Sequence, residues 1–190
     1  MANADLEAKM ELLAKIIEGR VVHDEDRVQV CIKGTILGFP ATIEALNAGW
    51  PFGVNYFIET HVIDDPNRPQ DPNGLKMTFI PRVARGLVQI FARVLLVESR
   101  GQRVGDKRLE SEFIMTYNNV DEAIRFSQYP GIAEKLKKLH KYSRFSELLV
   151  KAESGLWLAQ PISFKSLDPD LFRETFKMLG DIGQVLFEAF

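Results

Sequence analysis

The sequence has very little cysteine and no long apolar run. Its 190 residues include one cysteine, Cys31, so no disulfide can form within the chain. The longest apolar runs, such as Val94 to Val97, fall far short of the roughly 18 residues that a membrane-spanning helix needs. Asp5 and Glu7 stand where an export signal would carry basic residues. These absences predict a soluble, cytoplasmic protein with no membrane partner.

The sequence also lacks the short motifs that accompany well-known chemistry. It contains no Gly-x-Gly-x-x-Gly, no Walker loop, no Gly-x-Ser-x-Gly elbow and no His-Glu-x-x-His. The cysteine count excludes a zinc site built from paired cysteines. We therefore expect no cofactor and no metal.

Composition and charge describe an ordinary folded chain. Hydrophobic residues make up 46% of it and charged residues 26%, which argues against disorder. The net charge of −2 gives no reason to expect a nucleic-acid partner. The length suits one domain, residues 1–190.

The first half of the chain changes from a helical period to a strand period. Met10, Leu13 and Ile17 recur at helical spacing and predict an amphipathic helix over residues 4–18. Residues 27–82 are rich in β-type alternation, and their connections are too short for crossover helices, which favours antiparallel order. The predicted strands are 28–33, 41–47, 54–64 and 75–81.

The second half, residues 83–190, predicts more helices and a hairpin. Residues 83–98 fit a helix by their length, although their β-branched content also fits a strand. Residues 104–119 form a charged turn and a core strand, and we interpret them as the joint between the two halves. Further predictions are helices from Asn119 to Lys141 with a break at Pro130, a hairpin over 147–162 and an amphipathic helix from Asp168 to the last residue.

Together these patterns predict an α+β fold, in which helices pack on one face of a mainly antiparallel sheet. The order of the Val-Gly-Asp turn at 104–106, the acidic strand, the Asn119 cap and the hairpin resembles uncharacterised bacterial domains of unknown function. The resemblance covers residues 75–165. It implies no activity and assigns no functional residue.

Glu59 and His61 are the most interesting titratable pair. Two residues apart on a predicted strand, they share one face, with Cα atoms roughly 7 Å apart. A carboxylate can orient a histidine for acid–base catalysis. A solvent-facing polar patch explains the same pair, and we favour that interpretation.

Two other groups are weaker candidates for binding. Arg82 and Arg85 belong to a locally basic stretch that can hold a phosphate or carboxylate, although nearby acids also explain them as surface ion pairs. Trp50 and Phe52 lie at a predicted turn, where aromatic side chains either anchor a partner or cover the edge of the sheet.

The leading hypothesis is a non-enzymatic module that binds a protein partner or small ligand. Its two amphipathic terminal helices also suggest a homodimer. The alternative is a small hydrolase or isomerase that uses Glu59 and His61, with Arg82 or Arg85 binding an anionic substrate. A third alternative, a purely structural partner of another protein, is not separable from the first by sequence.

Overall fold

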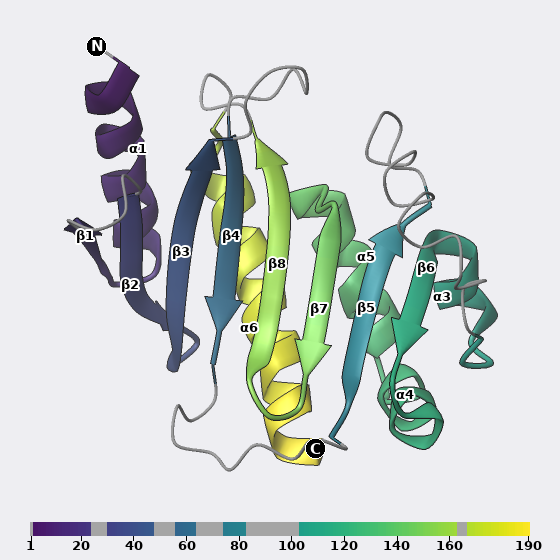
Figure 1. The fold of residues 1–190 in the computed structure, drawn as a ribbon. Coiled ribbons are helices and arrows are strands. Elements are labelled where there is room, and N and C mark those ends of the chain that lie inside the picture. Colours follow the sequence, from purple (N-terminus) through teal and green to yellow (C-terminus); the bar gives the residue numbers. More distant parts are fainter. Residues whose placement is uncertain (1, 24–29, 48–55, 64–73, 83–102, 163–166) are drawn as a thin grey trace.

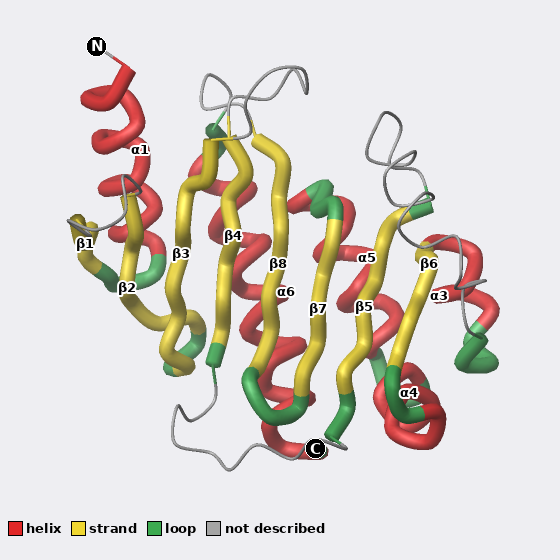
Figure 2. The backbone as a smooth tube through the Cα atoms, viewed as in Figure 1, coloured by secondary structure: helices red, strands yellow, loops and turns green. Residues whose placement is uncertain are grey.

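The computed structural model describes residues 2–23, 30–47, 56–63, 74–82, 103–162 and 167–190. Within these ranges one antiparallel sheet of eight strands is covered on one face by five helices (Figures 1 and 2). The predicted α+β class, the antiparallel order and the helical layer on one face are confirmed. None of the described helices is both long enough and apolar enough to span a membrane.

The sheet combines strands from both halves of the chain. Their order across the sheet is β1-β2-β3-β4-β8-β7-β5-β6. The strands are β1 (Arg20–His23), β2 (Val30–Ile36), β3 (Phe39–Asn47), β4 (Tyr56–Val62), β5 (Lys76–Pro81), β6 (Phe113–Tyr117), β7 (Glu147–Lys151) and β8 (Gly155–Ile162). The helices are α1 (Ala2–Ile16), α3 (Lys107–Glu112), α4 (Val120–Ser127), α5 (Ile132–Ser143) and α6 (Pro169–Ala189).

Strands β4 and β8 form the seam between two halves of the sheet. Strands β1 to β4 make a meander on one side of it, and β8, β7, β5 and β6 lie on the other side, with β5 coming from the first half of the chain. The seam runs in register from Tyr56 opposite Ile162 to Val62 opposite Leu156. The stretch 104–119 links the two halves along the chain and contributes the edge strand β6, which pairs with β5 of the first half.

The predicted helix caps at Asn119 and Asp168 are confirmed. The Asn119 side chain accepts a hydrogen bond from the Glu122 amide at 3.2 Å, and Asp168 accepts one from the Asp170 amide at 3.0 Å. Each cap satisfies a backbone donor that has no partner within its own helix. Helix α6, which Asp168 opens, packs against β8, β4 and β2 and against helices α1 and α5.

Two short elements have no counterpart among the predictions. Strand β1 has four residues and helix α3 has six, so neither contains enough residues to establish a period. Asp106 starts α3 by accepting hydrogen bonds from the Arg108 and Leu109 amides. The predicted helix over 83–98 lies outside the described residues.

Close backbone packing against β2 determines where α1 ends. The Thr35 amide donates to the Ile17 carbonyl at 2.8 Å. Gly19 permits this approach, because an added Cβ there would lie 2.5 Å from the Lys33 oxygen. The left-handed residue at this helix end is Glu18, with φ of 49°.

The core between the sheet and α5 contains a cluster of aromatic rings. Phe113 stacks on Phe145 with ring centroids 5.9 Å apart, and Phe79 meets Phe113 edge-on at 5.9 Å. The His140 ring lies 5.1 Å from Phe145, and its buried Nδ1 has no hydrogen-bond partner among the described residues. Burial lowers the pKa of His140 below its ordinary value, so this helix-end histidine is neutral at pH 7.

Replacing Gly155 with alanine should strongly destabilise the protein. Gly155 has φ of +93°, and an added Cβ would lie 1.9 Å from the Val62 oxygen, across the seam. Gly38 has a similar φ of +87° but open space around it, so Gly38→Ala is the matched control. Chemical denaturation should show a loss of about 3–5 kcal/mol for Gly155→Ala and about 1–2 kcal/mol for Gly38→Ala. Equal losses would contradict the steric explanation.

Acid should destabilise the fold partly through His140. Because burial lowers its folded-state pKa, the unfolded chain binds more protons once the pH falls below about 6.5. Stability therefore decreases from about pH 6.5 downward until the folded-state pKa is passed. In His140→Phe, the unfolding free energy should decrease less between pH 7 and pH 5. His61, whose pKa is also lowered, remains in both proteins, so pH sensitivity should be reduced rather than abolished. An unchanged pH profile would exclude this role for His140.

Candidate functional site

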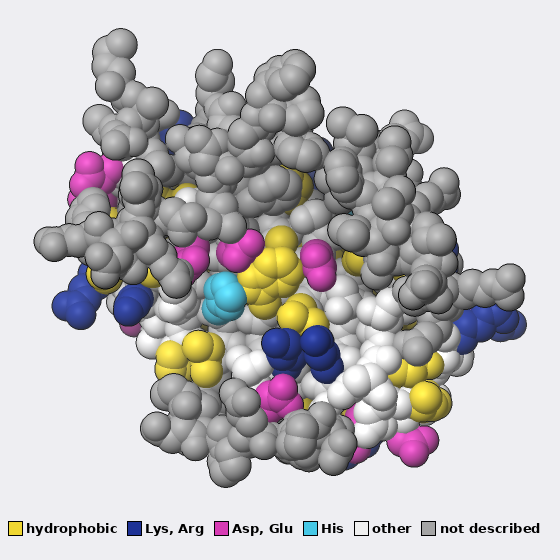
Figure 3. Space-filling view, in the orientation of Figure 1, with side chains coloured by type: hydrophobic (Ala, Val, Ile, Leu, Met, Phe, Trp, Pro, Cys, Tyr) yellow, Lys and Arg dark blue, Asp and Glu magenta, His cyan; other side chains and the backbone are white. Residues whose placement is uncertain are grey.

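The face of the sheet opposite the helices carries the candidate functional residues. Strand alternation buries Thr60 and Val62 of β4 and leaves Glu59 and His61 on the open face, partly exposed. The shared face that their spacing predicts is therefore present. Figure 3 shows acidic side chains and a histidine around hydrophobic side chains near the centre of this face, with basic side chains beside them.

Glu59 and His61 are held together with a third residue, Trp157 of β8. The indole Nε1–H of Trp157 donates to Glu59 Oε2 at 3.1 Å, and His61 Nε2 lies 3.9 Å from the same oxygen. The His61 and Trp157 rings meet edge-on, with centroids 6.3 Å apart. Glu59 and His61 come from β4, and Trp157 comes from the adjacent strand β8, where it is the cross-strand partner of His61. Glu59 therefore contacts both rings.

Three carboxylates lie in one row across four neighbouring strands. Glu44 of β3 is the cross-strand partner of Glu59 on β4. On the other side of β4, Glu59 lies opposite Ala159 of β8, and Ala159 in turn lies opposite Glu147 of β7. Neighbouring strands are about 4.8 Å apart, so Glu59 and Glu147 emerge about 10 Å apart on either side of Ala159. Trp157 lies two residues before Ala159 on the same strand. Ala159 is only 7% exposed, so the larger side chains around it cover the small alanine.

The row concentrates negative charge that is partly removed from water. Burial raises the pKa of the Glu147 carboxyl above its ordinary value, and the charge of Glu59 raises it further. Burial lowers the pKa of His61, an effect that Glu44 and Glu59 partly offset. Like charges on directly opposite strand positions destabilise a sheet. A cation placed over the row would relieve this repulsion.

The arrangement supports two kinds of chemistry. A neutral His61 beside Glu59 can accept a proton, as a general base requires. The acids around Trp157 can instead hold a cationic group against the indole face. Among the described residues no group of three or more histidine, cysteine or acidic side chains is arranged to hold a metal ion.

Arg82 is not brought to this site. Its Nε donates to the Glu110 carbonyl at 2.8 Å, which ties it to the α3–β6 segment. Strands β8 and β7 separate β4 from β5, so about 14 Å of sheet lies between the strand of Glu59 and the strand that Arg82 follows. Arg85, Trp50 and Phe52 lie outside the described residues.

Sequence reasoning missed Trp157, Glu147 and Glu44 as site residues. All three occupy strand positions with the same alternation that identifies Glu59 and His61. Trp157 is 98 residues from Glu59 along the chain, and no local pattern indicates which distant strands pair. Alternation alone could have named them as open-face residues, but not as neighbours.

Replacing Glu59 with glutamine should lower two pKa values together. Glu147 loses a neighbouring negative charge, so its raised pKa should fall toward the ordinary value. His61 loses a charge that favours its protonated form, so its pKa should fall further. NMR titration of both side chains measures the shifts, with Glu11→Gln on the exposed side of α1 as control. If either pKa stays fixed or rises, the charge coupling described here is wrong.

Comparison with known proteins adds no family assignment. A scan against protein-family models matches none, and searches of curated proteins and of solved structures find no match either. The resemblance of residues 75–165 to bacterial domains of unknown function therefore rests on the order of sequence features alone.

Proposed function

We propose that the protein is a non-enzymatic binding module whose open sheet face takes up a cationic group of a partner. The group is the guanidinium or ammonium of an arginine or lysine side chain, or of a small organic cation. The single observation that carries this proposal is the row of acids around Trp157. Glu59 and Glu147 lie on either side of Ala159, and the Trp157 indole is hydrogen-bonded to Glu59.

The electrostatics of the row favour a cation over a neutral ligand. Glu147 is held at a raised pKa by burial and by Glu59, so its charged form lacks compensation. A guanidinium between Glu59 and Glu147 would supply charge-assisted hydrogen bonds to both carboxylates. It would also remove the repulsion between Glu44 and Glu59, which are direct cross-strand partners.

The indole provides the second half of the recognition. Its Nε1–H is already bonded to Glu59, which fixes the orientation of the ring. An indole is the aromatic side chain that attracts cations most strongly, and an arginine also stacks flat on such a ring. Trp157 is partly exposed, and Glu59 lies at the edge of its ring, so the indole and the acid are both available to an organic cation.

A small hydrolase or isomerase is the second candidate function, favoured by the contact between Glu59 and His61. Their 3.9 Å separation and the lowered pKa of His61 suit a general base near neutral pH. Two features favour the binding module instead. Arg82 is bonded elsewhere, and a cavity between α1 and α6 and another between α5 and α6, both lined by described residues, lie in the helical layer rather than on this face.

Two further parts of the proposal come from other features of the chain. The amphipathic terminal helices support a homodimer, and the single Cys31 supports a reducing cytoplasmic location.

The binding proposal predicts that an arginine-containing peptide perturbs Trp157. The probe is a short peptide with one arginine between glycines, and the reference probe replaces arginine with the neutral isostere citrulline. The NMR signal of the Trp157 indole N–H, assigned by its loss in Trp157→Phe, should shift with the arginine peptide only. Glu147→Gln should weaken binding about tenfold, corresponding to the loss of one charge-assisted hydrogen bond of ~1.5 kcal/mol.

Two controls separate site binding from general attraction. Glu11→Gln removes the same charge from α1, in the helical layer, and should leave the affinity unchanged. Added salt should weaken the binding of the arginine peptide, because salt screens the attraction between the arginine and the carboxylates. Equal shifts with both peptides, or none with either, would refute the cation site.

A further inference from the structure

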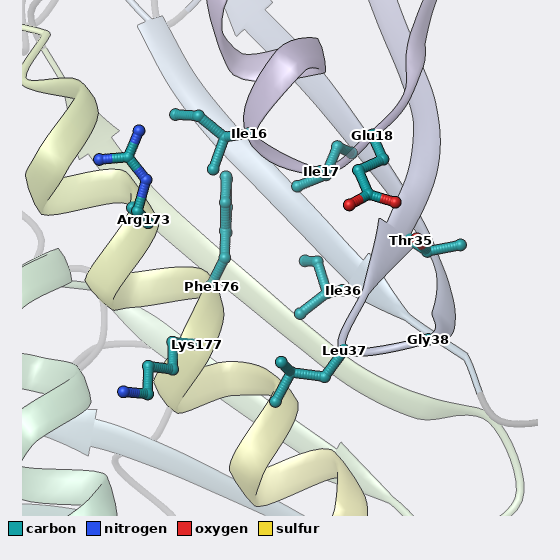
Figure 4. A pocket seen from close by; sticks show the side chains of 10 residues that line it. All are labelled: Ile16, Ile17, Glu18, Thr35, Ile36, Leu37, Gly38, Arg173, Phe176 and Lys177. Atoms are coloured by element: carbon teal, nitrogen blue, oxygen red, sulfur yellow. The ribbon is translucent and has the colours of Figure 1, made fainter.

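A groove opens in the helical layer, between the end of α1, the β2–β3 turn and α6 (Figure 4). Its volume is about 360 Å³. Ile16, Ile36 and Phe176 form apolar walls from three different elements. Such a groove resembles the pocket into which a buried apolar anchor fits at a protein interface.

Leu37, at the border of this groove, is both exposed and conformationally costly. It occupies the first position of the two-residue turn between β2 and β3, with φ of 49°. Such turns favour asparagine, aspartate or glycine, because a branched side chain is strained in the left-handed region. Leu37 contacts α6 at Gly180: a Cβ added to Gly180 would lie 2.8 Å from the Cδ1 atom of Leu37. Even so, 57% of Leu37 is exposed.

Contact with α6 alone does not account for a leucine at this position. The side chain of Leu37 packs against α6 at Gly180, yet more than half of the residue stays accessible, so α6 does not cover it. Leu12, one helical turn before Ile16 on α1, extends the apolar surface and is 37% exposed. Among described residues three large hydrophobic side chains are exposed, and one of them, Leu37, lines this groove.

The charges around the groove are arranged in a self-complementary way. Glu18 lies on the α1 side, and Arg173 and Lys177 lie on the α6 side. In Figure 4 the ends of Arg173 and Lys177 point away from the cavity. Arg173 pairs with Asp170, but neither Glu18 nor Lys177 takes part in a salt bridge among the described residues.

We propose that this groove binds a second copy of the same chain, with Leu37 of each protomer inserted into the groove of the other. A two-fold axis brings identical surfaces together in opposite directions, so an apolar projection next to an apolar groove pairs with itself. The same axis places Glu18 of one protomer opposite Lys177 of its partner. Both charges thereby gain an ion-pair partner, which neither has among the described residues of its own chain.

This inference rests on the homodimer suggested above and names its interface. It is independent of the cation site, because the helical layer and the open face lie on opposite sides of the sheet (Figure 1). Either can fail without the other. The arginine-peptide titration at Trp157 is therefore to be repeated on the monomeric variant described next.

The first test replaces Leu37 with asparagine. Asparagine tolerates the left-handed conformation, so the variant should keep or increase its thermal stability while losing the apolar anchor. Sedimentation between about 1 and 200 µM should show a dimer for the wild type and a dimer weakened about 30-fold or more for Leu37→Asn. Val120→Asn changes another exposed apolar side chain, 53% exposed on α4, and should leave the dimer intact.

The second test uses charge reversal. Glu18→Lys and Lys177→Glu each place like charges opposite one another in their own homodimers, so each variant alone should be monomeric. In a mixture of the two, both contacts pair opposite charges, and a heterodimer should form. This complementation is not expected if either substitution acts by disturbing the fold.

Several results would overturn the proposal. A wild-type chain that sediments as a monomer at every concentration would do so, and the groove would then serve at most a small apolar ligand. A Leu37→Asn variant that dimerises as tightly as the wild type would place the interface elsewhere. A mixture of the charge variants that stays monomeric would refute the two-fold pairing of Glu18 with Lys177.

Discussion

The pairing of β4 with β8 holds the two halves of the sheet together, and the candidate site depends on it. Every open-face contact of Glu59 with the second half of the chain crosses this seam, including the bond from the Trp157 indole. Gly155 helps to fix the register, because only a residue without a Cβ fits against the Val62 carbonyl. A slip by one residue would exchange the buried and exposed faces of β8 and remove Trp157 from the site.

The seam also explains why the open face is electrostatically unusual. Antiparallel register puts Glu44, Glu59 and Glu147 in one row, although they come from three separate strands. Burial of Glu147 disfavours its charged form, and the negative charge of Glu59 adds to this effect, so the pKa of Glu147 is raised. We propose that a sheet with such a row favours a positively charged partner. That preference, rather than any catalytic motif, defines the proposed activity.

The two faces of the molecule suit different partners for physical reasons. The open face offers acids and an indole, which suits a charged side chain presented by another molecule. The helical layer offers a groove and an exposed leucine with charges of both signs nearby, which suits a copy of itself. Because the sheet separates them, binding on one face need not compete with binding on the other.

The sequence by itself determined the class of fold, most strand and helix positions, the caps at Asn119 and Asp168, and the common face of Glu59 and His61. These features depend on local periodicity and on hydrogen bonds between near neighbours in the chain. Only the tertiary structure decided that Trp157 and Glu147 join Glu59, that Arg82 lies elsewhere, and that Leu37 projects beside a groove. These features follow from the order of the strands and the packing of the helices. Both depend on burial between segments that are far apart in the chain, and local sequence patterns do not encode such contacts.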